Sequence, residues 1–180
     1  MRKLTLRHIG QIKNAEIEFG DLTVLVGPQA TGKSIFLQFF KLLIDSGHIL
    51  AELKKHGLDW KKEKSRFLDI YFGEGMHGLW RSHSQILVED IVDDFDKLIS
   101  RQRKDKNEKL FFIPAQRVLT LGKGWPRPFT DYSPGDPFVV RQFSDHLRLL
   151  MEKGFGESDK LFPRTGRLKT EIRDLLQETV

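Results

Sequence analysis

Apolar and polar residues alternate along residues 3–19, with an interruption at Gly10. Alternation with a period of two is typical of half-buried strands, so the pattern predicts two of them. Residues 22–26 read Leu-Thr-Val-Leu-Val, a short β-branched run typical of strands that are buried on both faces. We therefore expect a third strand there, ended by Gly27.

Three stretches have the spacing of helices. Residues 34–45 are apolar on nearly every side, which predicts a buried helix packed on a sheet, and Gly47 is expected to end it. Residues 49–56 fit a short further helix. Residues 84–100 place apolar side chains at helical intervals, which predicts an amphipathic helix.

The remaining pattern is shorter or less regular. Residues 67–72 alternate well enough for a strand, and residues 110–113 form a candidate buried strand before a proline. Residues 122–137 contain four prolines and three glycines and are expected to be a loop. Helices are expected over residues 138–153 and from Leu168 onward.

The length and composition fit one ordinary domain. A chain of 180 residues can bury a real apolar core, and 39% hydrophobic with 31% charged residues is typical of a globular protein. No apolar run reaches the roughly 20 residues that a membrane span needs. The N-terminus also lacks the apolar core of a signal peptide. We therefore expect a cytoplasmic protein with no membrane partner.

The absence of cysteine and the net charge limit the kinds of site and partner that the protein can have. The absence of cysteine excludes disulfides, thiolate zinc sites and a cysteine nucleophile. The formal net charge of +5 is compatible with polyanionic partners, although many proteins with such a charge bind none. The six histidines have no metal-ligand spacing, so we expect no metal apart from one that accompanies a nucleotide.

Residues 27–34 match the phosphate-binding pattern G-x-x-x-x-G-K-[ST] in full, between an expected strand and an expected helix. Gly27 and Gly32 let the backbone wrap around a phosphate, so that the intervening amides point inward. The helix N-terminus adds its dipole, Lys33 supplies an ammonium for the β- and γ-phosphates, and Ser34 is placed to ligate Mg²⁺. The predicted nucleotide-binding residues of the loop are Gly27, Pro28, Gln29, Ala30, Thr31, Gly32, Lys33, Ser34 and Ile35.

The sequence up to about residue 45 resembles the N-terminal lobe of ABC-type ATPases of the SMC, RecF and OLD-like group, within the AAA family of ATP-binding proteins. The similar segments are residues 4–10 (LTLRHIG), 12–19 (IKNAEIEF) and 22–27 (LTVLVG), followed by the phosphate loop. The resemblance implies a P-loop NTPase fold of the α/β class that binds ATP and Mg²⁺. Its mixed sheet would have N-terminal antiparallel strands and a mainly helical insertion.

On this interpretation residues 1–180 are a single ATP-binding domain. Residues 1–46 supply strands, phosphate loop and first helix, and residues 47–109 form a helical, charged insertion. Residues 110–180 add a core strand, a Pro-rich loop and C-terminal helices. The final residues end inside a helical pattern with no stop signal, so the chain is interpreted as the N-terminal part of a longer ATPase.

The phosphate loop departs from the family pattern at two positions. The family usually reads G-x-N-G-x-G-K-S, whereas Gln29 and Ala30 stand at the Asn and Gly positions here. In this family a glutamine after a core strand meets Mg²⁺ and the γ-phosphate. Residues 111–117 (FFIPAQR) look similar, so Gln116 is the implied partner of Ser34 at Mg²⁺. An ordinary polar residue after a strand is the alternative.

Parts of the family's hydrolytic machinery are missing from the sequence. The family uses an apolar strand ending in Asp-Glu and a Ser-Gly-Gly signature that acts across a dimer. Residues 86–90 (ILVED) have the acids reversed and continue at a helical period, and no signature run follows. We therefore expect little or no ATP turnover from this chain alone. Hydrolysis would need residues from elsewhere, with a homodimer or a partner subunit meeting through the ATPase domain.

Several points stay open at this stage. The family's roles imply DNA repair, chromosome maintenance or phage defence, with DNA as a further partner. Basic residues gather in residues 54–66 and 101–109, where Trp60 or Trp80 lies nearby for base stacking, but solvated faces explain such runs more simply. A non-hydrolysing module, in which ATP only sets partner docking, remains an alternative. A P-loop kinase is a third, which the two strands before the loop disfavour.

Overall fold

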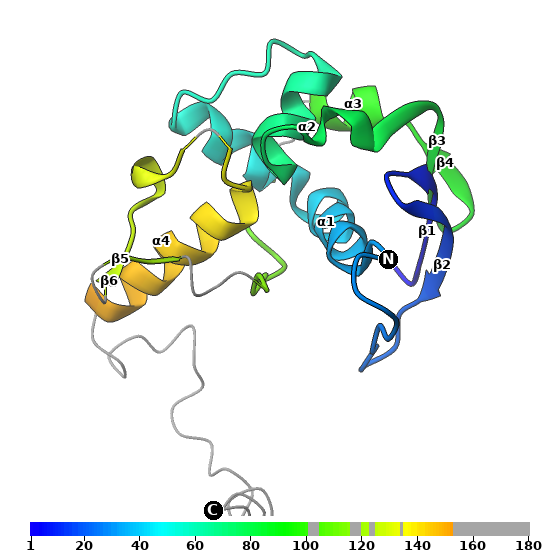
Figure 1. The fold of residues 1–180 in the computed structure, drawn as a ribbon, viewed down its shortest axis with the longest axis horizontal. Helices are drawn as coiled ribbons and strands as arrows, with labels where there is room; N and C mark the ends of the chain where they lie inside the picture. Colours follow the sequence, from blue (N-terminus) through cyan, green and yellow to red (C-terminus); the bar gives the residue numbers. More distant parts are fainter. Residues whose placement is uncertain (101–104, 116–119, 123–124, 134, 153–180) are drawn as a thin grey trace, which may run out of the picture.

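The computed structural model describes residues 1–100, 105–115, 120–122, 125–133 and 135–152, so the helix expected from Leu168 lies outside it. In the described residues, a curved antiparallel sheet lies beside one long helix, and shorter helices pack around that helix (Figure 1). The elements are β1 (Lys3–Ile9), β2 (Ile12–Glu18), α1 (Lys33–Lys55), α2 (Lys64–Phe72), η1 (Met76–Leu79), β3 (Trp80–Val88), β4 (Ile91–Asp93), α3 (Phe95–Ser100), β5 (Leu121–Gly122), β6 (Trp125–Pro126), η3 (Phe129–Asp131) and α4 (Phe138–Glu152).

The N-terminal hairpin is confirmed. β1 pairs with β2 and with β3, all antiparallel, in a four-stranded sheet of order β2-β1-β3-β4. Leu4 lies opposite Ile17, and Leu6 lies opposite Ala15. Leu4 and Leu6 are fully buried, because their face of the sheet packs on the apolar core. The fold is therefore mixed α/β, and the described residues contain no parallel pair of strands.

The strand expected at residues 22–26 is wrong for the described structure. These residues form no ladder, and Leu22, Val24 and Val26 are 84%, 68% and 87% exposed. A β-branched run indicates a tendency to be extended, but burial on both faces also needs flanking strands, and none of the described strands pairs with this segment.

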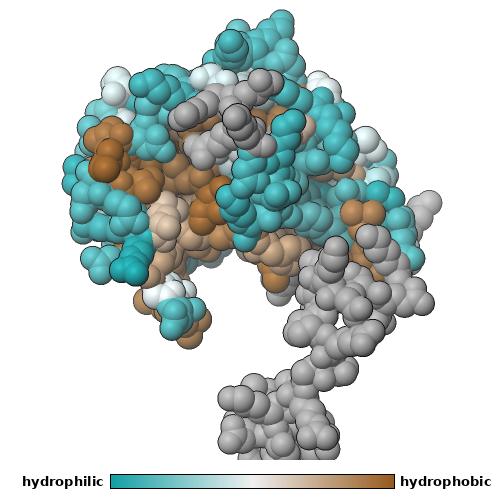
Figure 2. Space-filling model, turned by 180° about the vertical axis from the view of Figure 1, so that it is seen from behind, coloured by the Kyte–Doolittle hydropathy of each residue, from teal (hydrophilic) through white to brown (hydrophobic). Residues whose placement is uncertain are grey.

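Apolar side chains gather in a hollow on the face of the molecule that is seen from behind (Figure 2).

Helix α1 is longer than expected. It continues through Gly47, which is buried, so the stop at Gly47 is wrong and residues 49–56 are largely its final turns. Asp45 has non-helical backbone angles (φ −110°, ψ 20°) that kink the helix. Burial of the side chains of Ile49, Leu50 and Leu53 stabilises the part of the helix that follows Gly47. By length and composition α1 also fits a membrane span, but 61% of its most apolar stretch is buried in the protein, as in a core helix.

The strand expected at residues 67–72 is a helix. Phe67, Leu68, Tyr71 and Phe72 are buried along one face of α2. The pattern of residues 67–72 fits both the period of a strand and that of a helix. Packing against neighbouring aromatic rings favours the helix. Phe67 packs edge-on to Phe95, with ring centroids 6.1 Å apart, and Phe72 contacts Phe39 at 4.7 Å.

The helix expected over residues 84–100 is also wrong over most of its length. Residues 84–88 belong to β3, which pairs with β1, and residues 91–93 form β4, which pairs with β3; only α3 at the end is helical. Strands therefore occupy part of the insertion expected to be mainly helical. The hairpin turns at Glu89 and Asp90, which both have positive φ (50° and 65°). It lacks the Asn-Gly signal that normally reveals such a turn.

Residues 110–113 do not form the expected strand either. Phe111 and Ile113 are 46% and 60% exposed, and the segment is fixed instead by polar contacts with the kink of α1. The described residues within 122–137 are mostly irregular as expected, apart from the short β5–β6 pair and η3. Helix α4 (Phe138–Glu152) confirms the helix expected over residues 138–153, whose last residue lies outside the described residues.

A buried polar cluster joins α1 to this segment. Lys41, fully buried, lies 2.8 Å from the carboxylate of Asp45 and also contacts Glu108 and the carbonyl of Leu110. Asp45 accepts hydrogen bonds from the backbone N–H groups of Lys109 (2.9 Å) and Leu110 (3.0 Å). Burial, together with the nearby Asp45 carboxylate, raises the pKa of Tyr71 well above its ordinary value. The kink thus holds residues 108–110 against the helix.

Candidate phosphate-binding site

The N-terminus of α1 carries the phosphate loop. Gly32 is the N-cap residue, and α1 begins at Lys33 with no acidic residue in its first turn. The backbone N–H groups of residues 31–35 donate to no described backbone carbonyl. A row of free N–H groups at a helix start is a favourable place for an anion, because the helix dipole adds positive potential there.

Lys33 lies over this loop. Its ammonium donates to the carbonyl oxygen of Gly27 at 2.8 Å, to that of Pro28, and to Thr31 Oγ1 at 3.2 Å. All three acceptors are neutral, and no carboxylate of the described residues forms an ion pair with Lys33. No carboxylate of the described residues therefore compensates the positive charge of Lys33.

Two residues of the loop have left-handed backbones, which explains part of the motif. Gly32 has φ +93°, and a Cβ built there would lie 2.6 Å from Cγ1 of Ile12, so a side chain has no room. Ala30 has φ +63°, at the position where the resembling family has glycine. The loop closes with alanine there, but at the energetic cost of holding an L-residue in this region.

The other residues predicted to bind the nucleotide differ in which of their atoms are accessible. Ser34 is exposed at the helix start, and its hydroxyl makes no hydrogen bond to a described residue. Ile35 is buried, 7% exposed, so only its backbone N–H faces the loop. Pro28 and Gln29 are exposed on the outer part of the loop. Gln116 lies outside the described residues.

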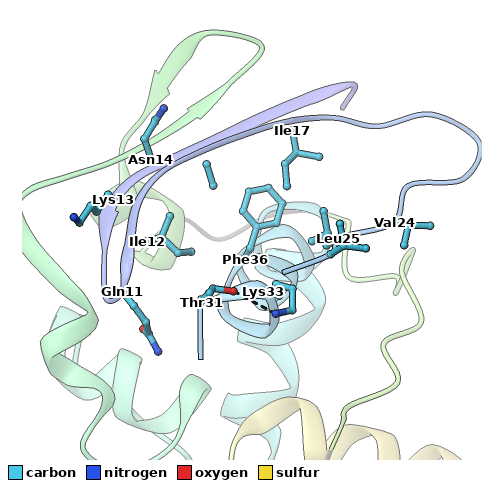
Figure 3. Close-up of a pocket in the computed structure, with 13 residues that line it drawn as sticks. Gln11, Ile12, Lys13, Asn14, Ile17, Val24, Leu25, Thr31, Lys33 and Phe36 are labelled. Atoms are coloured by element: carbon cyan, nitrogen blue, oxygen red, sulfur yellow. Dashed lines mark hydrogen bonds between the residues drawn. The ribbon is translucent and has the colours of Figure 1, made fainter. Parts of the chain in front are cut away.

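An apolar cavity of about 520 Å³ adjoins the loop. Phe36 of α1 stands in it between Ile12 and Ile17 of β2 and Leu25, while Thr31 and Lys33 line its edge (Figure 3). Its lining residues are Gln11, Ile12, Lys13, Asn14, Ala15, Ile17, Val24, Leu25, Val26, Thr31, Gly32, Lys33 and Phe36. The volume is within the roughly 300–1,000 Å³ of small-molecule sites.

The hairpin residues of this cavity were not among the candidates from the sequence. Their signal was available, because Ala15 and Ile17 occupy alternate positions of β2 and therefore share one face. What the sequence did not indicate is that this face is only half covered. The gap between β2 and residues 24–26 forms the cavity, with Leu25 partly buried against the core.

The two tryptophans considered for base stacking pack within the protein. Trp60 is only 4% exposed and its indole N–H donates to the carbonyl of Ile99 at 3.2 Å, so its ring is not presented at the surface. Trp80 packs against Phe95 with ring centroids 4.5 Å apart, and Lys64 lies over its ring at 5.4 Å.

The sequence matches no protein-family model, no curated protein and no solved structure.

Proposed function

We propose that this protein binds MgATP through residues 27–34. The observation that carries the proposal is the Lys33 ammonium, which has only neutral oxygens as partners above the free N–H groups of a helix start. A triphosphate would replace the carbonyls of Gly27 and Pro28 as the acceptor for Lys33. Its oxygens would also accept from the loop amides, and the charge would be favoured by the dipole of α1.

The remaining residues fit the other parts of the ligand. Ser34, next to Lys33, presents a hydroxyl that has no partner among the described residues, so it is available as a Mg²⁺ ligand. Gln116 is proposed as a second contact to Mg²⁺ and the γ-phosphate through the family resemblance. The cavity beside Phe36 adjoins the phosphate loop and is large enough for part of the nucleoside.

The resemblance extends the proposal to the N-terminal part of an SMC, RecF or OLD-like ABC ATPase. Residues 22–26 would be the strand that carries the phosphate loop in a P-loop sheet. The exposed side chains of Leu22, Val24 and Val26 support this, because their burial against added strands would release apolar surface from water. The proposed setting is cytoplasmic, in DNA repair, chromosome maintenance or phage defence.

Hydrolysis is proposed to need groups that this sequence lacks, namely a carboxylate that positions water and a signature motif acting across an interface. Lys33 and the loop amides would neutralise β- and γ-phosphate charge, and ATP would bind with little turnover. A non-hydrolysing module, in which ATP only controls association, is the second candidate. The exposed side chains of Leu22, Val24 and Val26 favour it equally, because either function uses that surface to meet another chain.

Calorimetric titration with ATP and Mg²⁺ tests the central proposal. We expect saturable binding that Lys33→Ala abolishes, and weaker binding of GTP. Lys97→Ala, which removes an 81% exposed lysine from α3, is the matched control and should bind as the wild type does. Absence of ATP binding by a folded wild-type chain would contradict the proposal. Phosphate release by the full-length protein separates an ATPase from a binding module.

A further inference from the structure

Strands β1 and β3 are joined through a bulge. The register of β1 on β3 shifts between Arg7 and Ile9, so that His8 alone lies opposite residues 81–84. His8 has φ +53°, in the left-handed region that residues with a Cβ rarely adopt. Bulges of this kind redirect side chains, and strained backbone is frequent next to functional sites. The strain at His8 therefore points to a function for this bulge.

The bulge brings two exposed histidines together. The imidazole rings of His8 and His83 have their centroids 4.8 Å apart and their planes at 70°. The hydroxyl of Ser84, which is buried, donates to the carbonyl of His8 and accepts from the N–H of Arg81 at 2.8 Å. Because Ser84 directly follows His83, these bonds hold the two histidine backbones side by side. The histidines are far apart in sequence, so their spacing did not reveal the pair.

The pair differs from the other histidines of the chain in its partners. Hydrogen bonds or ion pairs with described residues occupy the rings of the other four, which are His48, His56, His77 and His146. No ring nitrogen of His8 or His83 has such a partner among the described residues. A neutral imidazole nitrogen that is not used within the protein can bind a metal ion. His8 and His83 thus offer two nitrogen ligands at neighbouring places on the surface.

The separation of the two rings fits one shared metal ion. Zn²⁺ binds imidazole nitrogens at about 2.0–2.1 Å, so two rings on one ion have centroids roughly 4.5–5.2 Å apart when the angle at zinc is about 90–110°. The 4.8 Å between His8 and His83 lies within that range. No group of three His, Asp or Glu side chains among the described residues is placed to hold a metal ion. Water would therefore fill the remaining positions of an ion bound by this pair.

We propose that His8 and His83 bind one divalent transition-metal ion of the class that prefers imidazole, with Zn²⁺ as the expected member. Arg7 and Arg81, the exposed cations nearest to them in sequence, repel any cation, so bonds to nitrogen must supply the affinity. Imidazole suits Zn²⁺, Ni²⁺ and Cu²⁺, whereas Mg²⁺ and Ca²⁺ require oxygen ligands. The bound ion would link β1 to β3 at the bulge, and its binding energy would offset the backbone strain of His8.

The histidine pair is separate from the proposed nucleotide site. It uses none of residues 27–34, and it lies on the sheet, whereas the phosphate loop lies at the start of α1. The Mg²⁺ that would accompany ATP takes oxygen ligands, so the two ions also differ in chemistry. The proposal therefore does not rest on nucleotide binding, and Lys33→Ala should bind Zn²⁺ as the wild type does.

Calorimetric titration of the untagged full chain with zinc chloride, up to about 1 mM and without nucleotide, tests the proposal. We expect one Zn²⁺ per chain. His8→Asn should weaken binding about tenfold or more, because even the loss of a residue behind a metal ligand costs about 10–100-fold. Asparagine tolerates positive φ, so this variant should fold. The matched control, His77→Gln, removes an exposed histidine that already pairs with Asp69 at 3.2 Å, so it should bind as the wild type does.

Two further measurements separate binding from folding. His8→Gly removes a ligand and relieves the strain, so its thermal unfolding midpoint without zinc should rise while Zn²⁺ binding falls. In NMR spectra of the wild type, Zn²⁺ should shift the imidazole signals of His8 and His83 and leave those of the other histidines in place. No Zn²⁺ binding by the wild type, unchanged binding by His8→Asn, or displacement of Zn²⁺ by millimolar Mg²⁺ would overturn the proposal. Binding of inorganic phosphate in place of Zn²⁺ would also overturn it, because the bulge would then be an anion site.

Discussion

Two lysines on α1, eight residues apart, show how the choice of partners separates a site from a structural contact. Lys33 is partly exposed and bonded to two carbonyls and a hydroxyl, all of them neutral. Lys41 is fully buried and contacts the carboxylates of Asp45 and Glu108 as well as a carbonyl. The first retains a positive charge for a ligand, whereas the charge of the second is neutralised within the protein.

The comparison also separates the start of α1 from its middle. At Lys33 the helix start leaves N–H groups free and borders a cavity, as the proposed anion site requires. In the middle of the helix, Asp45 kinks the backbone and accepts from the N–H groups of residues 109 and 110, so this part fixes the fold. Substitutions at the start should therefore affect the proposed binding, and substitutions at the kink should affect stability.

The largest effect should come from Asp45→Ala. It removes the fully buried partner of Lys41 and leaves the N–H groups of Lys109 and Leu110 without their acceptor. Breaking a buried ion pair from one side costs about 3–5 kcal/mol, because a buried charge remains. Urea unfolding followed by circular dichroism measures the loss of unfolding free energy.

Glu152→Ala is the matched control for that measurement. Glu152 also pairs with a cation, Arg148, at 2.8 Å, but both partners are at the surface, with side chains 46% and 29% exposed. A pair of this kind contributes at most about 1 kcal/mol. If the two substitutions cost the same, burial does not distinguish Lys41 from an ordinary surface lysine and the comparison fails.

The sequence predicted the elements whose signals are local. Alternation was sufficient for the N-terminal hairpin, and it is clearest in β2, where Ala15 and Ile17 are partly buried and Glu16 and Glu18 are exposed on the other face. The helical period of residues 138–152 likewise predicted α4. The phosphate loop was found as a motif, and the structure places its last residues at the start of α1, although the strand expected before it is not formed.

The wrong predictions lie where contacts between residues far apart in sequence determine the local structure. The turn at Glu89 and Asp90 depends on Arg2 and Lys3, which are almost ninety residues away in sequence, so the local pattern suggested a continuous helix. The kink at Asp45 depends on residues 109 and 110 in the same way. Residues 22–26 have the composition of a central strand, but composition does not supply the neighbouring strands.

A smaller effect is expected at the phosphate loop from Gly32→Ala. The new Cβ would meet Ile12 at 2.6 Å, in addition to the strain of φ +93°. Gly57→Ala is the matched control, because its φ is +70° and nothing lies within 4 Å of the added Cβ. Gly32→Ala should cost roughly 1–3 kcal/mol more unfolding free energy than the control, the range for overpacking.

The double variant Ile12→Ala/Gly32→Ala sharpens that result. Removing the side chain that the new Cβ would meet should make the two substitutions less costly together than the sum of their separate costs. Strict additivity in urea unfolding would show that backbone strain, and not the contact with Ile12, keeps glycine at this position.

The smallest effect should appear in the pH dependence of stability, at His146, which contacts Glu108 of the buried polar cluster around Lys41. His146 contacts Glu108 at 3.2 Å, with Lys41, His48 and Asp145 also facing it. Burial lowers the pKa of His146, and it outweighs the Glu108 carboxylate, which acts in the opposite direction. The unfolded chain then binds a proton more readily than the folded chain, so unfolding free energy should fall as pH drops below about 6.5. His146→Gln should reduce this slope in urea unfolding between pH 7.5 and pH 5, because the glutamine does not titrate. A steeper loss in the variant would mean that the ion pair with Glu108 prevails over burial, and that this part of the cluster favours the charged histidine.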